Sequence, residues 1–290
     1  MTSTGVGFGK LILCGEHAVV YGHPAVAFAV DLQTEVSIER IVGPTSVVDC
    51  AADSRLVRAL HAVLEPTGWR VGVQSTVPIG RGMGSSAALA VGLVRARAAL
   101  DGEQLDPDTA YARAMPCERV FHGNPSGLDV AVAARGGCIR FTRGTPPKLE
   151  PLQPGDWSVV VLDTGLVGDT ASLVAEVASR RPGIDGTLTE IGALVDRCCA
   201  SLHDAGALGP LLTQNHRLLS QIGVSTPELD DLVTLALDAG ALGAKLAGAG
   251  GGGVAFALVH DDLAADRVLE AAHRHGIDAH KCSPANGGAP

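Results

Sequence analysis

A chain of 290 residues exceeds the usual size of one domain, which predicts two domains that share one cleft. Its net charge of −9 excludes the basic surface that nucleic acids and anionic membranes require, so a small-molecule ligand is expected. Seven cysteines without a C-x-x-C pair argue against a disulfide framework or a zinc site, and the apolar runs are all shorter than a membrane span.

The first half of the chain alternates apolar, β-branched runs with glycine and charged residues. Strands are predicted over 11–13, 25–30, 34–38 and 71–77. Helices are predicted over 85–100, 107–122 and 126–134, after a shorter one that Asp53 or Ser54 caps. Pro116 lies inside the second of these helices and is expected to kink it just before Glu118.

The second half of the chain begins after a proline-rich stretch. Four prolines between 146 and 154 are expected to interrupt any regular element, which predicts a boundary between a domain of residues 1–153 and one of residues 154–290. Strands are then predicted over 159–162 and 254–259, and near the end of the chain. Helices are predicted over 170–179, 187–203, 208–222, 227–239 and 263–275.

Residues 78–88 have the composition of a phosphate-binding loop. They read Pro-Ile-Gly-Arg-Gly-Met-Gly-Ser-Ser-Ala-Ala, so glycines at alternate positions lead directly into a predicted helix. Without Cβ atoms, such a loop lets backbone N–H groups converge on an anion, and the helix N-terminus adds partial positive charge. It is not a Walker A loop, because no Gly-Lys-Ser/Thr follows. The alternative is a tight strand-to-helix turn that Ser85 caps.

Three motifs in sequence order resemble those of the GHMP kinase superfamily. They are the loop above, residues 9–22 (Gly-Lys-Leu-Ile-Leu-Cys-Gly-Glu-His-Ala-Val-Val-Tyr-Gly) and residues 245–253 (Lys-Leu-Ala-Gly-Ala-Gly-Gly-Gly-Gly). A predicted strand follows the third motif, which is the wrong context for a dinucleotide fingerprint. The resemblance implies a two-domain α+β fold, with a ribosomal protein S5-like N-terminal domain and a ferredoxin-like C-terminal domain that carries extra helices.

Within that superfamily, the motif Gly-Glu-His-Ala-Val-Val at residues 15–20 looks like that of mevalonate kinases. Residues 118–129, Glu-Arg-Val-Phe-His-Gly-Asn-Pro-Ser-Gly-Leu-Asp, are similar to a second segment of those enzymes. The resemblance implies transfer of phosphate from ATP to the primary hydroxyl of (R)-mevalonate. Two alternatives stay open: a kinase of phosphomevalonate, homoserine or a sugar, and a non-catalytic binding protein on the same scaffold.

The resemblance also implies residue roles, position by position. Asp129 would be the base, Lys10 would lie beside the attacking hydroxyl, and Ser86 and Glu118 would hold Mg²⁺. The implied substrate-binding residues are Lys10, Glu16, His17, Asp129 and Thr164. The implied ATP-binding residues are Pro78, Gly80, Arg81, Gly82, Met83, Gly84, Ser85, Ser86, Ala87, Gly250 and Gly251. These types suit the chemistry, because Mg²⁺ prefers oxygen ligands and phosphoryl transfer depends on positioning and charge neutralisation.

Each role has a structural alternative. Asp129 can be an ordinary carboxylate at a helix N-terminus, Glu118 a solvated helix residue, and His17 a core histidine whose hydrogen bonds are satisfied. Pro116 departs from the usual pattern near Glu118, and the compact stretch of residues 40–70 leaves the adenine contacts unassigned. The expected partners are ATP and a small-molecule substrate, without nucleic acid or membrane, in the cytoplasm, and a homodimer is left open.

Overall fold

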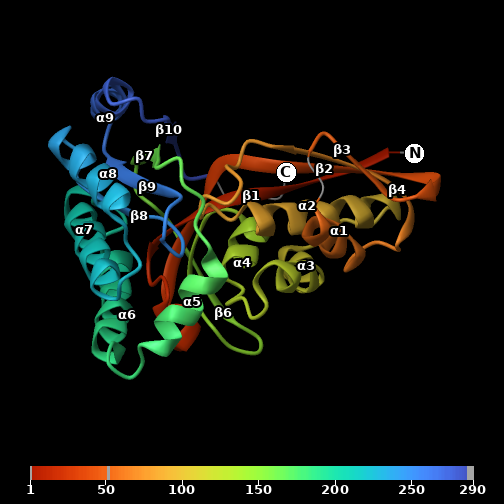
Figure 1. Cartoon of the computed structure of the whole chain (residues 1–290), viewed down its shortest axis with the longest axis horizontal. Coiled ribbons are helices and arrows are strands. Elements are labelled where there is room, and N and C mark those ends of the chain that lie inside the picture. The colour runs from red at the N-terminus through yellow and green to blue at the C-terminus, as the bar shows by residue number, and fades with distance from the viewer. Residues whose placement is uncertain (1, 51–52, 286–290) are drawn as a thin grey trace.

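The structure is a computed structural model that describes residues 2–50 and 53–285. It contains two β-sheets, each accompanied by its own helices (Figure 1). The first sheet is built from residues 2–152 and the second from residues 158–282. Within the described residues, no helix is long and apolar enough to cross a membrane.

The first sheet has six strands in the order β3-β4-β2-β5-β6, with β1 paired to β2. Its strands are β1 (Thr2–Cys14), β2 (Ala25–Pro44), β3 (Ser46–Val48), β4 (Thr67–Ser75), β5 (Cys138–Thr142) and β6 (Lys148–Leu152). The helices of this half are η1 (Ala18–Tyr21), α1 (Ser54–His61), α2 (Ser85–Leu100), α3 (Pro107–His122) and α4 (Leu128–Arg135). Asp53 caps α1 by accepting a hydrogen bond from Leu56 N–H.

Strand β2 is one long strand, so the prediction of two separate strands over 25–30 and 34–38 is wrong. Its first residues pair with β5 and its later residues with β4, while β1 pairs along most of its length. Asp31 has the character of a strand breaker in the sequence, yet it lies within β2. The strand predicted over 71–77 is β4, which begins at Thr67 and ends at Ser75.

Strand β1 begins at Thr2, well before the predicted start at residue 11. Its first half has glycines at alternate positions, which hide it from a search for apolar, β-branched runs. A Cβ at Gly5 would lie 2.3 Å from the carbonyl oxygen of Gly92, and one at Gly7 would lie 2.1 Å from that of Ala88. Helix α2 therefore packs directly on the backbone of β1, which only glycine permits.

Proline lies inside two elements of this half. Helix α3 spans the predicted residues from Pro107 to His122 with Pro116 inside it, and the expected kink at Pro116 stays a prediction. Pro151 lies in β6, a strand that the prolines were expected to exclude, and β6 stands at the end of the sheet order. An outer strand tolerates proline, because a missing N–H there need not break a ladder.

The second sheet has the order β10-β7-β9-β8, and all its pairs are antiparallel. Its strands are β7 (Ser158–Asp163), β8 (Gly243–Leu246), β9 (Val254–Val259) and β10 (Ala279–Cys282). The helices of this half are α5 (Thr170–Ser179), α6 (Asp185–Ala200), α7 (Ala205–Gln221), α8 (Pro227–Asp238) and α9 (Asp262–Arg274). This strand order and connectivity are ferredoxin-like, with extra helices between β7 and β8, which confirms the predicted α+β class.

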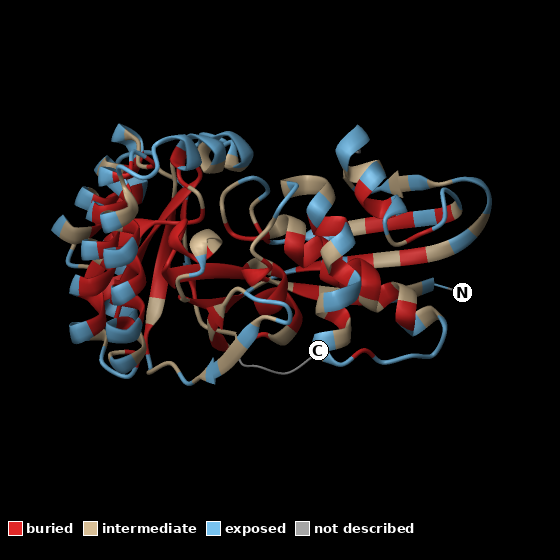
Figure 2. Ribbon diagram, turned by 90° about the horizontal axis from the view of Figure 1, so that it is seen from below, coloured by how far each residue is buried: buried red, intermediate tan, exposed pale blue. Residues whose placement is uncertain are grey.

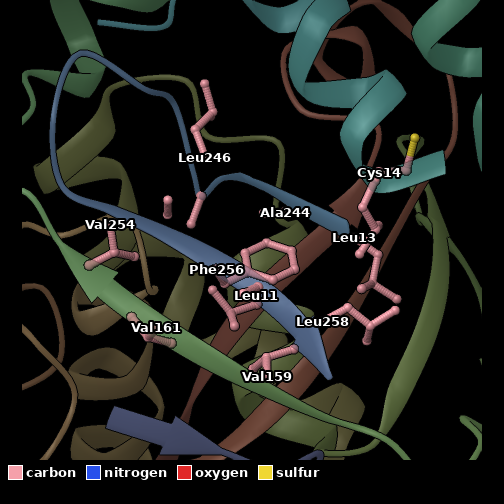
Figure 3. Close-up of a cluster of buried hydrophobic side chains, with 14 of the residues drawn as sticks. Leu11, Leu13, Cys14, Val159, Val161, Ala244, Leu246, Val254, Phe256 and Leu258 are labelled. Carbon is pink, nitrogen blue, oxygen red and sulfur yellow. The ribbon is translucent and has the colours of Figure 1, made fainter. Parts of the chain in front are cut away.

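One continuous core joins the two sheets. Leu11 and Leu13 of β1 pack with Val159 and Val161 of β7 and Phe256 of β9 (Figure 3). Strands β7, β8 and β9 of the second sheet are almost entirely buried, whereas the helices expose their outer faces (Figure 2). Because Lys10 precedes Leu11 on β1, this core holds the strand that carries the first candidate site residue against the second sheet.

Candidate active site

The predicted phosphate loop connects β4 to α2. Gly80, Gly82 and Gly84 have positive φ angles of 71°, 81° and 77°, which glycine adopts without strain. The N-cap of α2 is Gly84, so the alternative that Ser85 caps this helix is wrong. The first N–H groups of α2 thus receive no side-chain cap, and an anion at this helix end would satisfy them.

Lys10 and Asp129 meet beside this loop, from β1 and from the first turn of α4. Lys10 Nζ lies 3.1 Å from Asp129 Oδ2 and donates a hydrogen bond to the carbonyl oxygen of Gly82 at 3.0 Å. Lys10 is buried, whereas the side chain of Asp129 is 31% exposed. A Cβ at Gly84 would lie 2.9 Å from Lys10 Cγ, so the loop and the lysine are in close contact. Asp129 is therefore more than a helix-terminal carboxylate.

Ser86, Glu118 and His122 form a second cluster at the start of α2. Ser86 Oγ lies 3.3 Å from Glu118 Oε1 and 3.0 Å from His122 Nε2. Glu118 is 2% exposed, so the alternative of a solvated helix residue is wrong. Burial, with the nearby charge of Asp129, raises the pKa of Glu118 to about 8, and burial lowers the pKa of His122.

The donors of this cluster fit a magnesium ion. Glu118 Oε2 is buried without a hydrogen-bond partner, which is costly unless a cation or a proton compensates it. Ser86 Oγ supplies a second oxygen, and Mg²⁺ characteristically takes few protein ligands beside phosphates and water. Within residues 2–50 and 53–285 there is no group of three or more His, Cys, Asp or Glu side chains that could hold a metal ion by themselves.

Glu16 is held by protein groups. It forms an ion pair with Lys245, and both side chains are almost fully buried. Asn215 Nδ2 donates a hydrogen bond to Glu16 Oε2 at 2.8 Å, and Lys245 Nζ donates to the carbonyl oxygen of Leu246 at 2.7 Å. The network joins the first and third sequence motifs, and it engages both carboxylate oxygens of the residue that sequence reasoning assigned to the substrate.

His17 follows Glu16 in an unusual backbone conformation. Its φ of 58° and ψ of −49° accompany a hydrogen bond from Ala18 N–H to the carbonyl oxygen of Glu16, which defines a strained γ-turn. His17 Nε2 lies 2.8 Å from the carbonyl oxygen of Ala249, and burial lowers its pKa. The alternative of a buried, hydrogen-bonded histidine fits this contact. The contact also fixes His17 on the third motif.

The glycines of the third motif pack closely against other backbone. A Cβ at Gly248 would lie 2.7 Å from the Cα of Gly82, and one at Gly250 would lie 2.0 Å from the carbonyl oxygen of Val224. A Cβ at Gly251 would lie 2.4 Å from Leu173 Cδ1. A pocket between the two glycine loops is lined by Gly80, Arg81, Gly82, Gly168, Thr170, Ala247, Ala249, Gly250, Gly252 and Gly253. Gly250 borders this pocket, whereas Gly251 packs on α5.

Arg81 and Thr164 connect the phosphate loop to the second sheet. Arg81 Nε lies 3.0 Å from Asp163 Oδ2 at the end of β7. Thr164 Oγ1 donates a hydrogen bond to the carbonyl oxygen of Gly253 at 2.7 Å. The hydroxyl predicted to face the substrate thus holds the third motif.

Sequence reasoning missed three side chains of this region: His122, Asp163 and Lys245 as an ion-pair partner. His122 lies four residues after Glu118 on one helix, a spacing that places both side chains on the same face and was a usable signal. The partner of Lys245 lies more than two hundred residues away in the chain, and no local pattern predicts such a pairing.

Comparisons with known proteins agree with this arrangement. The family models for the N-terminal domain and the C-terminal region of GHMP kinases match residues 47–137 and 193–278. A mevalonate kinase of Thermococcus sibiricus is 36% identical over 86% of each chain, and one of Aeropyrum pernix is 33% identical over 97% of this chain and 95% of its own. The crystal structure of L. major mevalonate kinase in complex with R-mevalonate superimposes with a TM-score of 0.86 at 28% identity, over 98% of this chain and 97% of that one. The chain therefore belongs to the GHMP kinase family.

Proposed function

We propose that this chain transfers the γ-phosphate of ATP to the primary hydroxyl of (R)-mevalonate, giving ADP and 5-phosphomevalonate. One observation carries the proposal. The Lys10–Asp129 pair lies beside a glycine loop at a helix N-terminus, in a chain that is 36% identical to a mevalonate kinase. A paired lysine and carboxylate next to a phosphate site is what direct phosphoryl transfer to an alcohol needs.

The donor side is formed by the loop of residues 78–84 and the first turn of α2. Its N–H groups and the helix dipole bind the phosphates of ATP, and Lys10 adds a full positive charge at the same place. Ser86 and Glu118 would hold Mg²⁺, which would neutralise charge on the phosphates when bound.

The acceptor side is formed by Asp129 and the residues near it. Asp129 accepts the proton of the mevalonate hydroxyl, whose oxygen attacks the γ-phosphorus in line, and ADP leaves with the electron pair of the broken P–O bond. Lys10 stabilises the charge that develops on the transferred group. The family resemblance assigns His17 and Thr164 to the acceptor; both form hydrogen bonds to the third motif, and Glu16, the neighbour of His17 in the chain, pairs with Lys245 of the same motif.

A substrate panel tests this assignment. Release of ADP is measured with mevalonate, phosphomevalonate, homoserine and galactose at equal concentrations. The proposal requires mevalonate to have the highest kcat/KM of the four. A higher value for another acceptor would assign the chain to that substrate, and no ADP release with any of them would favour a binding protein.

Three further assignments accompany this function. We place the boundary between the domains at residues 153 and 154, supported by the first sheet's end at Leu152 and the second sheet's start at Ser158. A cytoplasmic location is supported by the seven cysteines, all of which are free thiols. The homodimer stays a prediction, which the molar mass in solution from light scattering decides.

A further inference from the structure

His122 contacts the proposed magnesium ligands, yet it has no role in the function described above. Its Nε2 lies 3.0 Å from Ser86 Oγ and 3.5 Å from Glu118 Oε1. It ends α3, one turn after Glu118, so the same helix carries both side chains. Its side chain is 30% exposed and Glu118 is nearly inaccessible, so the histidine lies on the outer side of the cluster.

The hydroxyl of Ser86 has one proton and two acceptors within reach. If it donates to Glu118 Oε1 at 3.3 Å, that carboxylate oxygen is engaged by a proton when a cation needs it. If it donates to His122 Nε2 at 3.0 Å, the proton points away from Glu118, and both the serine oxygen and the carboxylate keep free lone pairs. The shorter distance favours the histidine.

We propose that His122 is a positioning residue that accepts a hydrogen bond from the Ser86 hydroxyl and thereby leaves the lone pairs of the Ser86 and Glu118 oxygens available to a divalent cation. The inference rests on the proposed function, because the cation accompanies ATP. Side chains that orient metal ligands in this way typically change metal affinity about 10–100-fold when they are removed.

Three variants separate orientation from packing. His122→Leu replaces the imidazole by an apolar side chain of similar bulk and so removes the acceptor. His122→Gln keeps a polar atom near the position of Nε2. His273→Leu on α9 is the matched control, since it removes an exposed helical histidine in the other half of the chain.

The measured quantity is the dissociation constant of Mn²⁺, which electron paramagnetic resonance reports without turnover, in the presence of a non-hydrolysable ATP analogue. Affinity for the analogue alone and the melting temperature are measured in parallel. We expect His122→Leu to weaken Mn²⁺ binding about 10–100-fold, His122→Gln to restore it to within about threefold of the parent, and His273→Leu to leave it unchanged.

The inference is overturned if His122→Leu binds Mn²⁺ as tightly as the parent, or if glutamine restores nothing. A folded leucine variant that loses affinity for the analogue itself, with Mn²⁺ affinity unaltered, also overturns it, because the histidine would then act on the nucleotide. The parent enzyme separates the two proposals: if it binds Mn²⁺ and the analogue but does not phosphorylate mevalonate, the proposed function fails and the role of His122 is still decided by the variants.

Discussion

Replacement of Glu118 by glutamine should make the cation-free protein more stable while it removes a cation ligand. The carboxyl is 2% exposed, and its pKa rises from 4.5 to about 8 on folding. The folded state therefore holds this proton in a pH range where the unfolded chain has lost it. Stability that is present below about pH 4.5 is lost progressively as the pH rises to about 8.

The magnitude follows from these two pKa values. Relative to the non-titrating amide, the carboxyl should cost about 1 kcal/mol at pH 5, about 3 kcal/mol at pH 7 and about 5 kcal/mol at pH 9. The free energy of unfolding in urea, with a chelator present, should thus favour Glu118→Gln by a margin that widens with pH. Other titrating groups are common to both proteins and cancel in the difference.

Addition of Mg²⁺ with ADP should reverse the order, because a ligand that binds only the folded protein raises its stability. The free energy of unfolding should increase in the parent and change little in the glutamine variant. The Mg²⁺ concentration required for activity should be higher for the variant. A margin that stays constant between pH 5 and pH 9 would refute the reasoning, since it would mean that Glu118 ionises in the folded protein as it does in the unfolded chain.

Asp129→Asn should lower kcat by about 10²–10⁴ while the KM for mevalonate changes much less, because the proton acceptor acts mainly in the transition state; steady-state kinetics on a variant with an unaltered melting curve decide this, and a kcat within about threefold of the parent would exclude Asp129 as base. Gly84→Val should weaken ATP binding in calorimetric titration, because the φ of 77° is strained for valine and its Cβ would lie 2.9 Å from Lys10 Cγ; unchanged affinity would reduce the loop to a turn. Glu16→Met combined with Lys245→Met should leave thermal stability equal or higher, since buried ion pairs are often replaceable by apolar side chains, and should raise the KM for mevalonate. An unaltered KM in that double variant would separate the ion pair from the placement of His17.

Local patterns in the sequence predicted most of the helices and the phosphate loop. The roles of Lys10, Ser86, Glu118 and Asp129 came instead from the resemblance to a family, and the structure brings these four side chains together beside that loop. Helical periodicity and caps are written within a few residues, and so is a glycine loop before a helix. The predictions that failed depend on neighbours distant in the chain. The glycines of β1 interrupt the apolar pattern that predicts a strand. They are required because any Cβ at Gly5 or Gly7 would collide with a backbone carbonyl oxygen of α2.

The candidate site shows the same division. Glu16 was assigned to the substrate from its motif, but its partner Lys245 is brought to it only by the packing of β8 against β1 and α7. Pro116 departs from the usual pattern near Glu118, which left open whether the carboxylate is displaced. In the structure α3 continues through Pro116 and brings the Glu118 carboxylate to Ser86. A proline in a helix has a local cost, whereas the position of Glu118 is set by the whole helix.

The direct backbone contact between β1 and α2 has a consequence for how this enzyme can be redesigned. At Gly5 and Gly7, strand β1 packs main chain against main chain on α2, the helix that begins at the phosphate loop. A side chain at either glycine would push this helix away from the strand that carries Lys10. In laboratory evolution toward a new acceptor alcohol, substitutions should therefore accumulate on the acceptor side and spare these two glycines. The contact between β1 and α2 would then keep Lys10 and the phosphate loop at the same separation, whichever acceptor alcohol binds.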